Sequence, residues 1–250
     1  VERLKPPHWK HQPAAADQGA QVSEISAEIA GDLADLGINV NCAPVLDVRY
    51  PQTHNSLGDR AFSTDPVKVG EKGAQACRAF LQSGVIPVIK HLPGLGRAHL
   101  DTHHDLPSVT ATLADMETTD FVPFKHMLKQ DFADAAWGMV SHAVFDAVDP
   151  GTAASCSEKV IEDVIRKAIG FDGLLLSDDL SMGALNKYGD AAARAVKVIE
   201  SGCDIALHCN GDLAEMKLVA NTAPIMTNEA VVRYNRSVTS MRNFMRKDAA

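Results

Sequence analysis

Apolar residues recur along the chain in two alternating patterns, one typical of amphipathic helices and one typical of buried strands. Between about residues 14 and 36, apolar positions lie three and four residues apart, at Val22, Ile25, Ile29, Leu33 and Leu36. This spacing predicts an amphipathic helix. Gly37 follows, at the position where helices often end on glycine. The mostly apolar stretch 38–48 then predicts a buried strand.

The same alternation continues to the end of the chain. Further strands are predicted at 85–89, 137–145, 173–177 and 204–208, and helices at 66–82, 113–129, 160–169, 190–200 and in the C-terminal segment. Asp65-Pro66 predicts the start of the first of these helices. Pro123 predicts a break or kink in the second. Ser155 with Glu158 predicts a capping box before the third, and Gly170 its end.

Strands that alternate with helices predict a parallel sheet joined by right-handed crossovers. Polar residues follow the predicted strands, which suits either a (β/α)8 barrel or an open doubly wound sheet. Periodicity does not choose between these two α/β folds. The chain contains no GxGxxG or Walker pattern, so no nucleotide cofactor is predicted.

Composition narrows the class of protein. The chain has 250 residues and a net charge of −8, with acidic and basic residues mixed, which disfavours nucleic acid or an anionic membrane as partner. No apolar run approaches the ~18 residues of a membrane span, and the N-terminus VERLKPPHWK is too polar for a secretory signal. Five widely spaced cysteines without a CxxC pattern favour reduced thiols. We therefore expect a cytoplasmic protein with a single domain over 1–250 and no metal centre.

The segment 90–107, KHLPGLGRAHLDTHHDLP, concentrates titratable side chains directly after a predicted strand. Asp101 stands two residues before His103, so its carboxylate can hold one ring nitrogen and favour the imidazolium, which makes the histidine a usable general acid. A polar pair on a surface loop is the alternative interpretation. Lys90 at the strand end suits a Schiff-base lysine, a cation for substrate hydroxyls, or a solvated strand end.

Other candidates also follow strands. Asp178 ends an apolar run and suits a nucleophile, a metal ligand or a helix N-cap, while Arg60 suits a bidentate clamp or a surface ion pair. His142 suits a ligand or a buried structural histidine. A metal-dependent hydrolase using Asp47, His142 and Asp178 therefore stays open, as does an inactive sugar-binding fragment. His208, inside an apolar run, is predicted to be structural.

Several ordered motifs together resemble glycoside hydrolase family 3, in the subgroup of bacterial β-N-acetylglucosaminidases of the NagZ type. They are KHLPGLG at 90–96, DTH at 101–103 with LP at 106–107, SDDLSM at 177–182, GDRAF at 58–62, APVLD at 43–47 and GCD at 202–204. The resemblance covers nearly the whole chain. It implies a (β/α)8 barrel, of which about five of the eight units would be present here.

The resemblance also implies roles for individual residues. Asp178 would be the nucleophile, His103 the general acid/base and Asp101 its partner, which gives retention of configuration through a covalent glycosyl-enzyme. The sugar would be held by Arg3, Arg60, Lys90 and His91. The implied substrate is N-acetylglucosaminyl-1,6-anhydro-N-acetylmuramic acid and its peptides, in cell-wall recycling, with phosphorolysis as a variant within the family.

Two departures from the family pattern stand out. Leu95 replaces the histidine of the usual PGHG motif. The strands expected before Val1 are also missing, together with the DQEGG segment that precedes Arg3 in the family. A barrel without those strands exposes two sheet edges. We therefore expect the sequence to be part of a longer chain.

Overall fold

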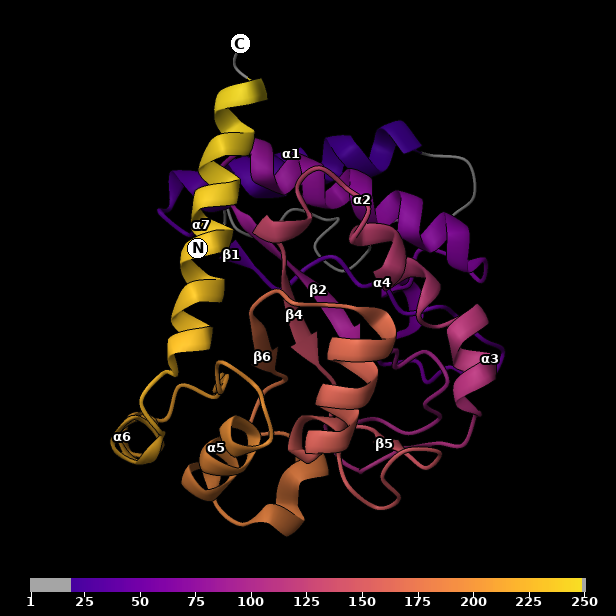
Figure 1. The fold of residues 1–250 in the computed structure, drawn as a ribbon, viewed down its shortest axis with the longest axis vertical. Helices are drawn as coiled ribbons and strands as arrows, with labels where there is room; N and C mark the ends of the chain where they lie inside the picture. Colours follow the sequence, from indigo (N-terminus) through magenta and orange to yellow (C-terminus); the bar gives the residue numbers. More distant parts are fainter. Residues whose placement is uncertain (1–18, 249–250) are drawn as a thin grey trace.

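A parallel β-sheet forms the centre of the molecule in the computed structural model, which describes residues 19–248. Its strands lie in the order β1 (Val40–Asn41), β2 (Ile86–Leu92), β4 (Trp137–Val140) and β6 (Leu175–Ser177), and every neighbouring pair is parallel (Figure 1). Two further strands, β3 (Ser108–Val109) and β5 (Val144–Phe145), pair with each other in parallel. The predicted α/β class with a parallel sheet is confirmed, in the form of a curled sheet.

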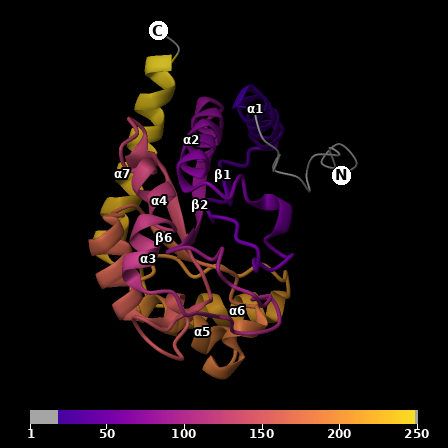
Figure 2. The ribbon, with the colours of Figure 1, turned by 90° about the vertical axis from the view of Figure 1, so that its right-hand side faces the viewer.

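Helices connect the strands and surround the sheet. They are α1 (Gly19–Asp35), α2 (Pro66–Gln82), α3 (Leu113–Thr118), α4 (Val122–Met127), the π-helix η6 (Val160–Ile169), α5 (Ala191–Glu200), α6 (Leu213–Thr222) and α7 (Asn228–Asp248). Figures 1 and 2 both place α1 and α2 at one end of the molecule and α5 and α6 at the other. No helix in the described part of the chain is both long enough and apolar enough to cross a membrane.

The two faces of the sheet are packed differently. One face joins the large core between sheet and helices, to which β2 contributes Ile89 and, after a shift in register between Lys90 and Leu92, also Leu92. The other face carries a second cluster, and Val238 and Met241 of α7 pack against it; its members are Ile86, Val88, Trp137, Met139, Leu174 and Leu176. Trp137 Nε1 also donates to Ser237 Oγ of α7 at 2.8 Å. Successive side chains of a strand alternate between faces, so Lys90 and Asp178 continue this second face at the carboxyl ends of β2 and β6.

Several predicted helix boundaries are confirmed. Asp65 accepts hydrogen bonds from the N–H groups of Val67 and Lys68 at the start of α2, which ends at Gln82 as predicted. Pro123 lies in the first turn of α4, and the predicted helix 113–129 is broken into α3 and α4. Gly170 ends η6 with a φ of 87°, a left-handed conformation that glycine adopts without a side-chain clash.

Other predictions were wrong in detail. Of the predicted strand 38–48, only two residues form β1, and the main sheet has four strands where five were expected. The predicted strand 204–208 is reduced to an isolated bridge between Ile205 and Leu176. Ser155 does not cap the following helix; Ser157 Oγ accepts from the N–H of Val160 instead, at 3.2 Å. Helix α6 was not predicted.

Candidate active site

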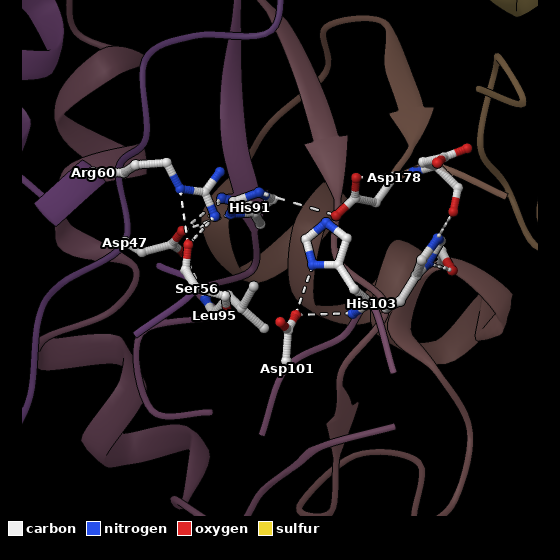
Figure 3. A network of polar contacts seen from close by, with 11 residues as sticks. Asp47, Ser56, Arg60, His91, Leu95, Asp101, His103 and Asp178 are labelled. Carbon is white, nitrogen blue, oxygen red and sulfur yellow. Dashed lines mark hydrogen bonds and ion pairs between the residues drawn. The ribbon is translucent and has the colours of Figure 1, made fainter. Parts of the chain in front are cut away.

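The carboxyl ends of β2 and β6 bring three of the predicted site residues together. Lys90 and His91 lie within the last residues of β2, so the strand continues past the predicted 85–89 and includes the start of the segment 90–107. Asp178 comes directly after β6, and β4 separates the two strands. Because parallel strands end at the same edge of a sheet, these side chains share one edge. Figure 3 shows His91 and Asp178 there.

Asp47 is a buried carboxylate that fixes His91, and the prediction did not assign it a place in the glycosidase site. Its side chain is fully buried, and it accepts from His91 Nδ1 at 2.7 Å and from the N–H of Leu95 at 2.6 Å. Since a carboxylate only accepts, His91 Nδ1 carries the proton. Nε2 then faces Asp178 Oδ2, 4.0 Å away (Figure 3). The sequence signal that could have indicated this role of Asp47 is its position at the end of a predicted buried strand.

The adjacent residues Asp178 and Asp179 are bonded very differently. Both carboxylate oxygens of Asp179 are engaged, by the N–H and the hydroxyl of Ser181 and by the N–H of Cys209. The Asp178 carboxylate accepts through Oδ1 from the N–H of Asp179 at 2.9 Å, and Oδ2 faces His91. This difference distinguishes a structural carboxylate from one with an oxygen available for chemistry.

Electrostatics keep Asp178 ionised. Burial alone would raise the pKa of Asp178, but electrostatic interactions with His91, His142 and Lys90 and the hydrogen bond from the N–H of Asp179 outweigh it, so the pKa lies below its usual value. Burial also lowers the pKa of Lys90, and the charge of Asp178 opposes that effect. The edge therefore presents an ionised carboxylate beside the Lys90 amine.

Asp101 and His103 form the pair that their spacing predicted. Asp101 Oδ1 accepts from His103 Nδ1 at 2.6 Å and from the His103 N–H at 3.0 Å, while 59% of the His103 side chain is exposed. Burial alone would raise the pKa of Asp101, but these hydrogen bonds and the charge of His103 outweigh it and the pKa is lowered. With Nδ1 held by the carboxylate, Nε2 is left to exchange a proton.

The loop that carries His103 is docked on the segment that follows Asp178. The carbonyls of His103 and Thr102 accept from the N–H groups of Gly183 and Ala184, at 2.9 and 3.2 Å. A Cβ atom at Gly183 would lie 2.8 Å from the His103 carbonyl oxygen, so only glycine permits this contact without a shift. The docking holds the His103 pair beside the Asp178 edge (Figure 3).

Comparison with known proteins now identifies the family. The Glycosyl hydrolase family 3 N terminal domain matches residues 10–239. The chain belongs to glycosyl hydrolase family 3. The beta-hexosaminidase of Nitrosomonas eutropha is 36% identical over 188 residues, 75% of this chain and 52% of its own length. That of Nitrosospira multiformis is 33% identical over 211 residues, 84% of this chain and 58% of its own. The chain thus spans somewhat over half the length of these relatives.

Solved structures of family 3 proteins agree with this fold. A beta-N-acetylglucosaminidase from Paenibacillus sp. str. FPU-7 superposes with a TM-score of 0.79 and 28% identity, over 95% of this chain and 45% of that chain. NagZ from Neisseria gonorrhoeae, in complex with N-trifluoroacetyl-D-glucosamine, gives a TM-score of 0.75 and 26% identity, over 91% of this chain and 65% of that chain. The fold of the family 3 domain is therefore present in this chain.

The remaining predicted residues are placed as follows. Arg60 donates through Nε and Nη2 to the carbonyl of Ser56, at 3.1 and 2.8 Å, which holds its guanidinium near His91 (Figure 3). Arg3 lies outside the described residues. Leu95, which replaces the family 3 histidine, is 8% exposed, and its N–H is bound by Asp47. Its position in the loop is therefore fixed through its backbone.

His142 is buried, the side chain of His208 is 6% exposed, and both rings are bonded. His142 contacts Ser155 Oγ through Nδ1 at 2.8 Å and the Asp179 carbonyl through Nε2 at 3.0 Å, so neither ring nitrogen is available to a metal. His208 Nε2 contacts Glu215 at 3.0 Å, as a structural histidine would. No group of three or more His, Cys, Asp or Glu side chains within residues 19–248 is arranged to hold a metal ion. All five cysteines are free.

A second buried charge, Asp120, ties the loop after β2 to the helices. Arg97 donates through Nε to Asp120 Oδ2 at 2.7 Å, and the hydroxyl of Tyr50 donates to the same oxygen at 3.1 Å. The Arg97 guanidinium lies over the Tyr50 ring, 4.3 Å from its centre. Asp47 and Tyr50 lie in the loop that follows β1, and Arg97 lies in the loop that follows β2. The Asp120 cluster therefore joins these two loops beside the site.

Removing Arg97 is expected to destabilise the fold strongly. The Asp120 side chain is fully buried, so Arg97→Met leaves its charge without a cation and lowers the free energy of unfolding by about 3 kcal/mol. Urea unfolding measures this change. The double variant Arg97→Met/Asp120→Asn should recover part of the loss, since the uncompensated charge is gone. Arg78→Met, whose partner Asp131 is 61% exposed, is the control and should cost clearly less; equal losses would contradict the argument.

Proposed function

We propose that this chain carries the catalytic centre of a retaining β-N-acetylglucosaminidase. The observation that supports this most directly is the free oxygen of Asp178, held at the strand edge beside His91 and beside the docked Asp101–His103 pair. A nucleophile and an acid/base on two segments that contact each other suit a double displacement at one carbon. The beta-hexosaminidase relatives and the solved beta-N-acetylglucosaminidase support N-acetylglucosamine as the sugar that is cleaved.

The proposed reaction has two steps. Asp178 Oδ2 attacks the anomeric carbon and forms a glycosyl ester, while the bond to the leaving oxygen breaks and His103 Nε2 gives that oxygen its proton. In the second step, His103 takes a proton from water, whose oxygen attacks the same carbon and releases the Asp178 carboxylate. Asp101 stabilises the imidazolium before the first step and after the second. Each step inverts the carbon, so the overall configuration is retained.

Cationic and imidazole side chains would hold the sugar. Lys90, His91 and Arg60 are proposed to bind its hydroxyl and N-acetyl groups, with Arg3 as a fourth contact. The proposed natural substrates are cell-wall fragments that carry terminal β-linked N-acetylglucosamine, such as N-acetylglucosaminyl-1,6-anhydro-N-acetylmuramic acid and its peptides. A cytoplasmic recycling role is part of the same proposal.

Turnover of an aryl glycoside tests this function. The protein is expected to release nitrophenol from 4-nitrophenyl N-acetyl-β-glucosaminide, and NMR of the first-formed sugar should show the β-anomer. The matching β-glucoside, which lacks the N-acetyl group, should react far more slowly. An α-anomer as first product would exclude the two-step route, and no reaction by folded protein with either glycoside would refute the proposed activity.

A further inference from the structure

The orientation of the Asp178 carboxylate depends on its neighbour in the chain. Oδ1 accepts from the N–H of Asp179, and this bond turns Oδ2 toward His91. Asp179 is itself held from two sides. Its carboxylate is bound by the N–H groups of Ser181 and Cys209, at 3.1 and 3.0 Å, and its carbonyl is bound by His142 Nε2 at 3.0 Å. His142 thus contacts the residue that orients Asp178.

The imidazole of His142 is itself fixed. A carbonyl oxygen only accepts, so His142 Nε2 must carry a hydrogen, and in the neutral ring Nδ1 then accepts from the hydroxyl of Ser155 at 2.8 Å. Both His142 and Ser155 are fully buried. Burial lowers the pKa of His142, although the charge of Asp178 opposes this shift, so the ring is neutral at pH 7. The His142 ring is therefore held as one tautomer in one orientation.

We propose that His142 is a positioning residue, which fixes the Asp178–Asp179 turn through the Asp179 carbonyl and so aims the Asp178 carboxylate. Ser155 supports it by selecting the tautomer. This inference rests on the proposed function of Asp178 as nucleophile. His142 is a buried donor that acts through another residue, and it contacts neither sugar nor water in this role.

Two substitutions at His142 separate positioning from packing. His142→Leu introduces an apolar side chain of similar size and removes the donor. For the nitrophenyl glycoside, kcat should fall about 100-fold while KM stays within about threefold of wild type. His142→Gln places an amide N–H near the position of Nε2 and should recover at least about tenfold of that loss. His126→Leu, on α4 and away from the strand ends, is the matched control and should keep wild-type kcat.

A second readout does not depend on turnover. In His142→Leu, the Asp179 N–H is less well held, so the Asp178 carboxylate loses part of a stabilising hydrogen bond and its pKa should rise by roughly 0.5–1 unit. Lys90 and His91, which also interact with Asp178, are unchanged. The ¹³C signal of the Asp178 carboxyl group follows this titration directly. His142→Gln restores the donor without the imidazole, so it should return this pKa toward the wild-type value; a histidine that acts on Asp178 only through its own charge would leave the pKa raised in both variants.

The outcomes distinguish the two proposals. If wild-type protein hydrolyses no glycoside, the proposed function fails, and the Asp178 titration still decides whether His142 positions its carboxylate. Folded His142→Leu protein with wild-type kcat and an unshifted Asp178 titration would overturn the inference. If His142→Leu does not fold, Ser155→Ala replaces it. Loss of the hydroxyl frees the ring to change tautomer, and kcat should fall about tenfold; an unchanged kcat there would overturn the inference equally.

Discussion

Asp178→Asn is expected to reduce turnover of 4-nitrophenyl N-acetyl-β-glucosaminide by about 10⁴-fold. The amide oxygen can still accept the N–H of Asp179, so the local structure is preserved. However, a neutral amide neither attacks the anomeric carbon effectively nor stabilises the positive charge that develops on the sugar in the transition state. The expected effect is therefore on kcat, with KM little changed, and steady-state kinetics measures both.

The smaller variant Asp178→Ala allows a sharper test of the same step. Azide can enter the space that the carboxylate leaves and attack the anomeric carbon from the same side. The α-glycosyl azide should form while nitrophenolate departs, and NMR identifies the product. Asp163→Asn is the control, because that carboxylate is 60% exposed and pairs with Lys167 on η6. Activity of Asp178→Asn near that of Asp163→Asn would show that another group is the nucleophile.

His103→Ala is expected to have an effect that depends on the leaving group. With an alkyl or sugar leaving group, whose alkoxide is a strong base, loss of the acid should slow bond cleavage by about 10³-fold. A nitrophenolate leaves without a proton, so the first step with that substrate should be nearly unaffected. Hydrolysis of the glycosyl-enzyme then lacks its base and becomes rate-limiting. A burst of nitrophenol followed by slow turnover is the expected time course.

The neighbouring histidine provides the control for this experiment. His104 lies on the same loop and is exposed, and the proposal gives it no catalytic role. His104→Ala should therefore react like wild type with both classes of substrate. If His103→Ala instead lost the same factor with every leaving group, the residue would serve binding or loop structure, and the acid/base role would be wrong.

Local signals in the sequence predicted much of the framework of this site. Asp65 with Pro66 marks the start of α2, and Asp101 with His103 forms the expected pair because the contact spans only two residues. Contacts between distant segments carry no such signal. The bond from Asp47 to His91 joins residues 44 positions apart, and no periodic pattern in the chain indicates it.

The distinction between Asp178 and Asp179 shows the same limit. In the sequence, the two aspartates are equivalent candidates at the end of a strand. They differ because Cys209, 30 residues further on, donates to Asp179, and because His142 binds the carbonyl of Asp179. The resemblance to the family selected Asp178, whereas hydrogen bonding gives a physical reason for that choice. Arg3 remains a prediction because it lies outside the described residues.

The docking of the His103 loop has a consequence for the order in which this protein matures. The strands of the main sheet, β1, β2, β4 and β6, lie side by side in the order of the chain. Each strand is therefore synthesised after the neighbour with which it pairs. The loop at 101–105 is different, since the N–H groups that hold it belong to Gly183 and Ala184, about 80 residues later. A growing chain therefore contains Asp101 and His103 before the segment that docks their loop has been synthesised. In the proposed mechanism, the acid/base pair is placed only when the His103 loop joins the segment after β6.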